Sequence, residues 1–419
     1  MPRSMNTVEV DSGQLLENLA ELAQIGADPA GGITRLAYTS ADLEARNWFT
    51  EKARNAGLAI SIDPIGNILA VEPSETDKAP VLSGSHLDSV PGGGRFDGAL
   101  GVVVALEAVR SIRHRRGFQR RRPLGVAVLA AEESSRFGIG CLGSRVIVQD
   151  LSKVQLESLL DDQGITLFEA LKRIGLDGSR WPEARRSPGW FNEFVEIHID
   201  QANDLLRAGV PLGVITSIAA PTRLRLMVHG EQAHSGATRM HERRDALLGA
   251  AEIVLEVEAT AKAHADQGIV GTVGILRIHQ QSMNMVPGMV ELAIDLRGIN
   301  MPTLGGVVES LTEKSHKIAS NRGLRLEISV LQRSQPVQVS EERVARLENA
   351  CQKVGVKYLR MASRSAHDAM YMSQHGPISM LFVRNLSGVS HSPAENASPE
   401  DLVAGASVLA TYMASAAQE

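Results

Sequence analysis

The chain has 419 residues, of which 43% are hydrophobic and 22% charged, and its formal net charge is −5. This composition is ordinary for a globular enzyme of two or three domains, and it excludes a strongly basic nucleic-acid-binding protein. Two cysteines, Cys141 and Cys351, argue against a disulfide framework, and no run approaches the ~20 apolar residues of a membrane span. The polar N-terminus lacks a signal peptide's apolar stretch, so we expect a cytoplasmic protein.

One basic stretch stands out against this acidic background. Residues 110–122 read RSIRHRRGFQRRR. We interpret the stretch as an exposed helix end followed by a loop, because no aromatic residues alternate with the arginines as they do in nucleic-acid grooves. We therefore expect neither nucleic acid nor a membrane among the partners.

The first part of the chain alternates helix-like and strand-like segments, which predicts an α/β fold. Ser40 is a good N-cap and Gly57 a good C-terminal stop for one of the helices. Residues 126–130 are apolar throughout, as in a central strand buried on both faces. The expected helices cover about 13–25, 40–57 and 98–114, and the expected strands lie near 59–62, 67–71, 81–84 and 126–130.

The middle of the chain has a different pattern. Residues 222–228 alternate polar and apolar side chains, as a half-exposed strand does. Helices are expected at about 242–265 and 304–321, and further strands near 269–278, 289–297 and 325–331. This β-α-β-β-α-β order is the ferredoxin-like pattern. We predict a lid or dimerisation domain at 218–332, inserted into a larger domain formed by 1–217 and 333–419. The larger domain would end with strands near 356 and 380–383 and a helix at about 399–414.

Residues that bind metals follow apolar runs along the larger domain. They are His86, Asp97, Glu132, Glu133, His198 and His391. In open α/β sheets, sites gather at the carboxyl ends of the strands, and we place these side chains there. Each alone has a structural explanation, but so many at comparable positions predict a two-metal hydrolase centre.

Imidazoles mixed with carboxylates suit Zn²⁺, with Mn²⁺, Co²⁺ or Ni²⁺ as alternatives. One carboxylate can bridge two ions, and a second one nearby can accept a proton from water. The pair Glu132–Glu133 offers a ligand and a base if the chain turns at the end of its strand. Asp88 is placed to hold the tautomer of His86 from behind.

Segments along nearly the whole chain resemble the M20 metallopeptidase clan, and more closely its amidase, hydantoinase and carbamoylase branch. That branch contains N-carbamoyl-L-amino-acid hydrolase, β-ureidopropionase and allantoate amidohydrolase. A histidine at position 198, where many M20 peptidases have a carboxylate, favours it. The matching segments include Gly84–Val90, Gly93–Gly98, Glu132–Phe137, Leu142–Arg145, Glu196–Gln201, His234–Thr238, Asn284–Gly288, Asp295–Arg297, His367–Met370 and Ser390–Glu395.

This resemblance implies a fold and a set of residue roles. The larger domain would be a two-metal hydrolase domain with a mixed sheet between helices. One metal would be held by His86, Asp97 and His198, and the other by Asp97, Glu133 and His391, with Glu132 as general base. His234, from the lid of the partner in a homodimer, would stabilise the oxyanion. The substrate carboxylate would bind Asn284 and Arg297, and its ureido end would contact Gln201 and His367.

The implied reaction is hydrolysis of the ureido C–N bond of an N-carbamoyl-L-amino acid or a related ureido acid such as allantoate, releasing ammonia and carbon dioxide. The family's usual pattern changes at Asp200, Arg239 and Arg364, which leaves the substrate open. A second hypothesis is an M20 dipeptidase or N-acyl amino-acid hydrolase with the same two metals. A third is a metal-bound binding protein, against which Glu132 argues because such a protein has no need of a base.

Overall fold

The computed structural model describes residues 7–115 and 117–419. Residues 1–6 of the polar N-terminus and residue 116 of the basic stretch therefore lie outside the described residues. Backbone contacts divide the chain into two compact units. The first contains the chain up to Thr216 together with Val339–Met361 and His367–Glu419, and the second contains Ser217–Gln338 and Ala362–Ala366. The second unit extends beyond the predicted 218–332, because Val337 and Gln338 pair with Ile218 and Ser217.

A nine-stranded mixed sheet forms the centre of the first unit, as expected, and its last strands reach into the second. Its order is β1-β2-β4-β3-β5-β15-β6-β13, and β14 also pairs with β6. Strands β4, β3, β5 and β15 run parallel to their neighbours in this series, and the pairs β1–β2, β2–β4 and β15–β6 are antiparallel. The bounds are β1 Ala59–Ile62, β2 Ile68–Val71, β3 Val81–His86, β4 Leu124–Leu129, β5 Glu193–Ile199, β6 Leu212–Ile218, β13 Val337–Gln338, β14 Tyr358–Ser363 and β15 Ile378–Val383.

Helices pack against this sheet and against one another. The long ones are α1 Ser12–Leu22, α2 Ser40–Asn55, α3 Ala99–His114, α10 Glu341–Val354 and α12 Pro399–Ala416. The sequence predicted neither α10 nor the short helices, which are α4 Leu142–Ile147, α5 Lys153–Glu157, α6 Leu167–Arg173, α7 Asp204–Ala208 and α11 Asp368–Met372, with a 3₁₀ turn at Gly178–Ala184. Helix α3 contacts β3, β4 and β5 and is almost wholly buried. Among the described helices, none has both the length and the apolar character to cross a membrane.

Local signals set the element boundaries, with two corrections. Thr39, not Ser40, caps α2, because its hydroxyl accepts the Asp42 backbone N–H. The strand expected near residue 356 begins two residues later, after Gly355 ends α10 at φ +80°. Gly57 follows α2 at φ +75°, a left-handed conformation that favours glycine, as predicted.

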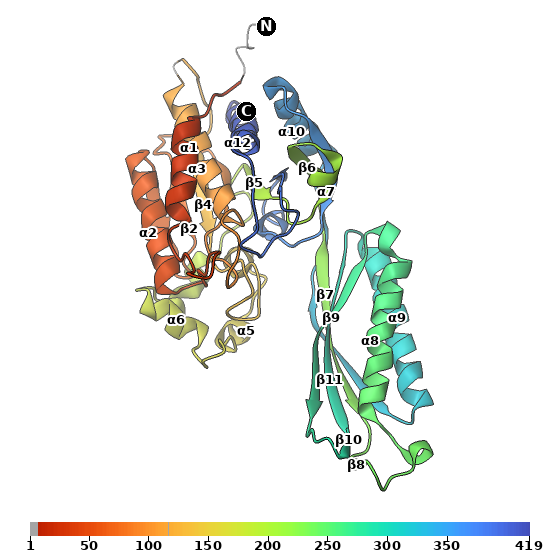
Figure 1. Cartoon of the computed structure of the whole chain (residues 1–419). Helices are drawn as coiled ribbons and strands as arrows, with labels where there is room; N and C mark the ends of the chain where they lie inside the picture. Colours follow the sequence, from red (N-terminus) through yellow and green to blue (C-terminus); the bar gives the residue numbers. More distant parts are fainter. Residues whose placement is uncertain (1–6, 116) are drawn as a thin grey trace. The chain divides into compact units, whose positions relative to one another are not determined.

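The second unit has a four-stranded antiparallel sheet in the order β12-β7-β11-β9. With α8 and α9, which lie side by side on one face (Figure 1), this is the ferredoxin-like arrangement. A core of Leu, Ile and Val side chains fills the space between helices and sheet. The bounds are β7 Ala220–His229, α8 Ala246–Ala263, β9 Val270–His279, β11 Met289–Gly298, α9 Met301–Asn321 and β12 Arg325–Arg333, and the short strands β8 Ala233–His234 and β10 Met285–Val286 pair beside this sheet.

Candidate active site

Five of the six predicted metal-type residues form two groups that share Asp97. His86, Asp97 and His198 form one group, and Asp97, Glu133 and His391 form the other, with the possible ligand atoms of each group within 4.8 Å of one another. All five belong to the first unit. The parallel neighbours β3 and β5 bring His86 and His198 together. Asp97 lies in a turn, as the glycine-rich segment around it indicates, whereas Glu133 and His391, which we expected at strand ends, lie in loops.

Two of these turns contain a non-glycine residue in the left-handed backbone conformation. Ala131, just after β4, has φ +52°, and His391 has φ +53°. A non-glycine residue in the left-handed region costs free energy that the surrounding structure must offset, and such residues cluster at functional sites. The turn at Ala131 separates the directions of Glu132 and Glu133, as their two predicted roles require. Gly98 has φ +64°, and a Cβ there would lie 2.4 Å from the His86 ring.

The two buried imidazoles direct acceptor atoms toward Asp97. The Nδ1 atoms of His86 and His198 lie 2.9 and 3.0 Å from the backbone carbonyls of Asp88 and Ile199, so each Nδ1 carries the hydrogen. The Gly98 amide donates to Nε2 of His198, so this nitrogen carries a lone pair and no hydrogen. These Nε2 atoms lie 3.6 and 3.1 Å from Asp97 Oδ1, a buried oxygen that accepts no hydrogen bond from the described residues.

Lone pairs that converge on an unsatisfied buried carboxylate oxygen fit a cation. Burial opposes charge on His86 and His198, yet the nearby carboxylates hold the pKa of both rings above the ordinary value. Burial also opposes charge on Asp97, but His198, His391 and His86 hold its pKa well below its usual range. The same negative field that favours a proton on the imidazoles would favour a divalent metal ion, so these residues fit the predicted metals.

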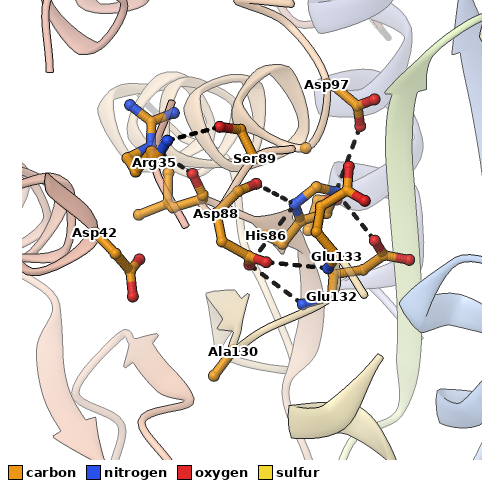
Figure 2. Close-up of polar contacts among 12 residues, drawn as sticks. Arg35, Asp42, His86, Asp88, Ser89, Asp97, Ala130, Glu132 and Glu133 are labelled. Atoms are coloured by element: carbon orange, nitrogen blue, oxygen red, sulfur yellow. Dashed lines mark hydrogen bonds and ion pairs between the residues drawn. The ribbon is translucent and has the colours of Figure 1, made fainter. Parts of the chain in front are cut away.

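Asp88 differs from its predicted role. The tautomer of His86 is set by the Asp88 backbone carbonyl, whereas the carboxylate oxygen Oδ1 lies 3.9 Å from Nδ1. The carboxylate instead accepts the backbone N–H groups of Glu132 and Glu133 at 3.2 and 3.0 Å (Figure 2). Asp88 thus holds the turn that carries the predicted base and ligand. A spacing argument could not find this, because the contact joins segments 44 residues apart.

Glu132 and Glu133 face different partners. Glu132 Oε2 lies 3.8 Å from His86 Nε2, and Glu133 Oε1 lies 3.4 Å from His391 Nε2. Burial raises the pKa of Glu132 well above its usual range and raises that of Glu133 to about 7. A carboxyl group whose pKa is raised toward neutrality can both accept and return a proton.

Two predicted substrate residues of the first unit lie beside the ligand groups. Gln201 donates from Nε2 to Asp97 Oδ2 at 3.1 Å, and its buried Oε1 accepts no hydrogen bond from the described residues. His367 is buried, and the centroid of its ring lies 4.6 Å from the ring centroid of His198 and 5.6 Å from that of Phe382. The structure therefore brings both close to the candidate centre, and their contacts with a substrate stay predictions.

The other three predicted residues belong to the second unit. His234 and Asn284 are exposed and lie on or beside the paired strands β8 and β10. His234 Nδ1 accepts the backbone N–H groups of Gly236 and Ala237. Arg297 on β11 pairs with Asp295 through two hydrogen bonds of 3.0 and 3.3 Å. Their roles in oxyanion and carboxylate binding stay predictions.

Sequence reasoning missed two further contributors. Cys141 is buried, and its sulfur donates to Glu132 Oε1 at 3.1 Å. Glu395 was noted only as part of a matching segment, yet its carboxylate accepts the backbone N–H groups of Phe96 and Asp97. The Ser390–Glu395 segment itself was the available signal for Glu395, and no sequence pattern indicated Cys141.

Comparison with known proteins identifies the family. Residues 82–415 match the model of peptidase family M20/M25/M40, and the chain belongs to this family. The chain is 38% identical over 401 residues to an N-carbamoyl-L-amino acid amidohydrolase of Geobacillus stearothermophilus, which covers 96% of this chain and 97% of the relative. It is 36% identical over 414 residues to a ureidoglycolate hydrolase of Oryza sativa subsp. japonica, with 97% and 84% covered.

A solved structure agrees with both. The hydantoinase/carbamoylase family amidase of Burkholderia vietnamiensis superposes with a TM-score of 0.88 at 34% identity, with 99% of each chain covered. This similarity spans both units, and it supports the resemblance that the sequence motifs indicated.

Proposed function

We propose that this protein is a metal-dependent amidohydrolase that cleaves the ureido C–N bond of an N-carbamoyl-L-amino acid or a related ureido acid such as allantoate, with release of ammonia and carbon dioxide. The observation that carries the proposal is the pair of ligand groups sharing Asp97, with the raised-pKa carboxyl of Glu132 beside them. Relatives named for ureido substrates, similar over nearly the whole chain, support the choice of bond.

In this proposal His86, Asp97 and His198 hold one divalent ion, and Asp97, Glu133 and His391 the other. Bound there, two ions would polarise the ureido carbonyl and lower the pKa of a water molecule. Glu132 would accept the proton of that water and then return it to the leaving nitrogen. Asp88 would keep Glu132 in place through the backbone contacts of its turn.

The substrate-holding residues would divide the molecule's two ends between them. Arg297 suits the carboxylate end, because a guanidinium pairs with a carboxylate through two parallel hydrogen bonds. Asn284 would assist it, His234 would stabilise the oxyanion, and Gln201 and His367 would contact the ureido end. No described residue donates a hydrogen bond to the buried Oε1 of Gln201, which supports its proposed contact with an N–H group at the ureido end.

We also propose Zn²⁺ as the native metal, with Mn²⁺, Co²⁺ or Ni²⁺ as alternatives, because the ligand groups mix imidazole with carboxylate. We propose a cytoplasmic location as well. The free and buried state of both cysteines supports it, since reducing compartments keep thiols unpaired.

The direct test is ammonia release by metal-reconstituted protein. The substrates would be allantoate, N-carbamoyl-β-alanine and several N-carbamoyl-L-amino acids, and a dipeptide and an N-acetyl amino acid scored by free amine would be controls. Turnover of at least one ureido acid, lost on chelation and restored by metal, is expected. Turnover of the controls alone would move the protein to the dipeptidase or acylase hypothesis, and metal binding without any turnover would favour a binding protein.

We further propose a homodimer. Strand β9 is an edge of the second unit's sheet, and its apolar side chains Val270, Ile275 and Leu276 are 44%, 47% and 45% exposed. An exposed apolar edge strand offers unpaired backbone groups and hydrophobic surface to another chain. A second copy would cover both.

The dimer proposal is tested by complementation. If His234 acts on substrate held by the other subunit, mixing inactive His234→Ala and Glu132→Gln proteins should restore part of the activity in heterodimers. Light scattering would establish the oligomeric state, and tagged subunits would establish exchange. Complete absence of rescue despite exchange would argue against a shared site.

A further inference from the structure

A buried carboxylate, that of Glu395, lies beside the proposed metal ligands. It has no role in the proposed function. Glu395 follows His391 by four residues, in the segment between β15 and α12, and it is 3% exposed. A buried carboxylate is retained at a cost unless its oxygens are hydrogen-bonded. What Glu395 contacts therefore indicates what it does.

Both oxygens of Glu395 are used, and they connect two distant turns. Oε1 accepts the backbone N–H groups of Phe96 and Asp97 at 2.9 and 3.1 Å. Oε2 accepts the hydroxyl of Ser390 at 3.0 Å. One side chain thus ties the turn that carries the shared ligand Asp97 to the turn that carries His391, across almost 300 residues of sequence.

The Asp97 turn is shaped around this carboxylate. A Cβ on Gly94 would lie 2.0 Å from Glu395 Oε1, and its three nearest neighbours would all be side-chain atoms of Glu395. Gly94 does not have a positive φ, so its backbone does not demand glycine. A side chain at this position would displace the carboxylate of Glu395, which occupies the space.

Besides Glu395, the His391 turn reaches the ligand cluster through the hydroxyl of Ser390 and through the ring of His391, whose Nε2 lies 3.3 Å from Asp97 Oδ2 and 3.4 Å from Glu133 Oε1. His391 is 48% exposed at its side chain and adopts the left-handed conformation, and Val389 is 46% exposed. Asn385 closes the base of the segment by donating to the Val389 carbonyl and accepting the Asn396 N–H. Toward Asp97, the Ser390 hydroxyl reaches Oδ2 at 3.1 Å, but its single hydrogen is shared with Glu395.

We propose that Glu395 is a positioning residue that locks the Asp97 turn to the His391 turn and thereby sets the affinity of the second metal position, formed by Asp97, Glu133 and His391. The inference assumes the metal centre of the proposed function and deepens it. Glu395 touches no substrate in this role. It acts by holding two ligands from different parts of the chain at a fixed separation before the ion arrives, which reduces the ordering that binding requires.

The experiment measures Zn²⁺ binding by apo-protein variants, using competition with a chromophoric chelator, and the metal content after gel filtration. Glu395→Ala should bind one ion per chain as the wild type does and lose roughly 10- to 100-fold in affinity for the other. Glu395→Gln should lose less, because its amide oxygen can still accept the two backbone N–H groups. Gly94→Ala should reproduce the loss from the opposite side of the contact, because its Cβ displaces the carboxylate.

Asn396→Ala is the matched control. Asn396 receives a hydrogen bond of 3.1 Å from Arg95, so it connects the same two segments, but at the surface. Its loss should leave both affinities unchanged. A weakening as large as that of Glu395→Ala would mean that any contact between the segments suffices, and would overturn the specific role of Glu395.

Failure of the inference is separable from failure of the metal centre. Wild-type protein that binds no Zn²⁺ would refute the proposed function itself. Wild type that binds two ions, with unchanged affinities in folded Glu395→Ala, would refute only the role of Glu395. Circular dichroism would establish folding. If Glu395→Ala does not fold, Gly94→Ala and Glu395→Gln decide the matter, since unchanged binding in both would equally contradict the lock.

Discussion

Around Asp97 the predicted functional side chains of the first unit range from buried to half-exposed: His86 and His198 are each 1% exposed, whereas the side chain of His391 is 48% exposed. In the second unit, His234 and Asn284 are exposed and Arg297 keeps 30% of its side chain exposed. In the first set, the buried Oδ1 of Asp97 accepts no hydrogen bond from any residue that the structure describes, whereas His234 and Arg297 have partners within their own unit. The first region is thus built to receive a cation, and the second must exchange internal contacts for a substrate.

Among the substitutions in the buried centre, Glu132→Gln should reduce activity most. The amide keeps the shape of the side chain but cannot take a proton, so we expect kcat to fall by about 10²–10⁴-fold. Metal content should stay at the wild-type value, because Glu132 belongs to neither ligand group. Steady-state kinetics on the best ureido substrate and metal analysis of the same preparation provide the check. Full activity in this variant would refute the assignment of the base.

The buried centre should also respond to pH through its ligands. Without metal, burial and the Asp97 carboxylate raise the pKa of Glu133 to about 7. The hydrogen bond between His391 and Asp97 raises the pKa of His391 to about 9. Both groups hold protons below these values, and a metal must displace them. The apparent affinity should therefore rise with pH, by roughly tenfold per unit for each proton displaced, more steeply below pH 7 than between 7 and 9. Chelator-competition titrations from pH 6 to 9 would measure it, and an affinity independent of pH would exclude these ligands.

The exposed set predicts a different kind of effect, on substrate binding alone. Arg297→Lys keeps the charge but loses the planar fork, so KM should rise by about 10-fold with little change in kcat. Metal content should not move. Arg223→Lys is the control, because Arg223 pairs with the same Asp295 at 3.1 Å without being a predicted substrate residue. Equal effects of the two substitutions would show that the Asp295 network, and not the substrate carboxylate, is what matters.

The sequence predicted the architecture because its signals are local or periodic. The apolar run of β4, the alternation in β7 and the β-α-β-β-α-β order each follow from side-chain periodicity. Short helices such as α4 and α5, with six and five residues, have too few turns to show a period. Boundaries moved where two residues compete for one task, as Thr39 and Ser40 do for the cap of α2.

The identity of the candidate ligands could be predicted, but their supporting contacts could not. Residue type alone marks His86 or Asp97 as a possible ligand. The role of Asp88 depends on which of its carboxylate oxygens accepts which backbone N–H group. The role of Glu395 depends on a contact between residues almost 300 positions apart in the sequence. Such contacts are properties of the folded chain, so a single sequence shows them only as unexplained polar residues.

Cys141 tests how finely the buried centre is tuned, and we expect the smallest effect there. Its thiol donates to Glu132 Oε1, while Oε2 faces His86, so the thiol holds one oxygen and leaves the other available for proton transfer. A thiol is a weak donor, so Cys141→Ala should lower kcat by only about 3- to 10-fold and leave KM unchanged. Cys141→Ser, which restores a hydroxyl donor at nearly the same place, should recover most of the loss. Cys351→Ala, at the other buried free cysteine, is the control. If Ala and Ser at position 141 reduce kcat equally, packing of the sulfur rather than its hydrogen bond to the base explains the effect.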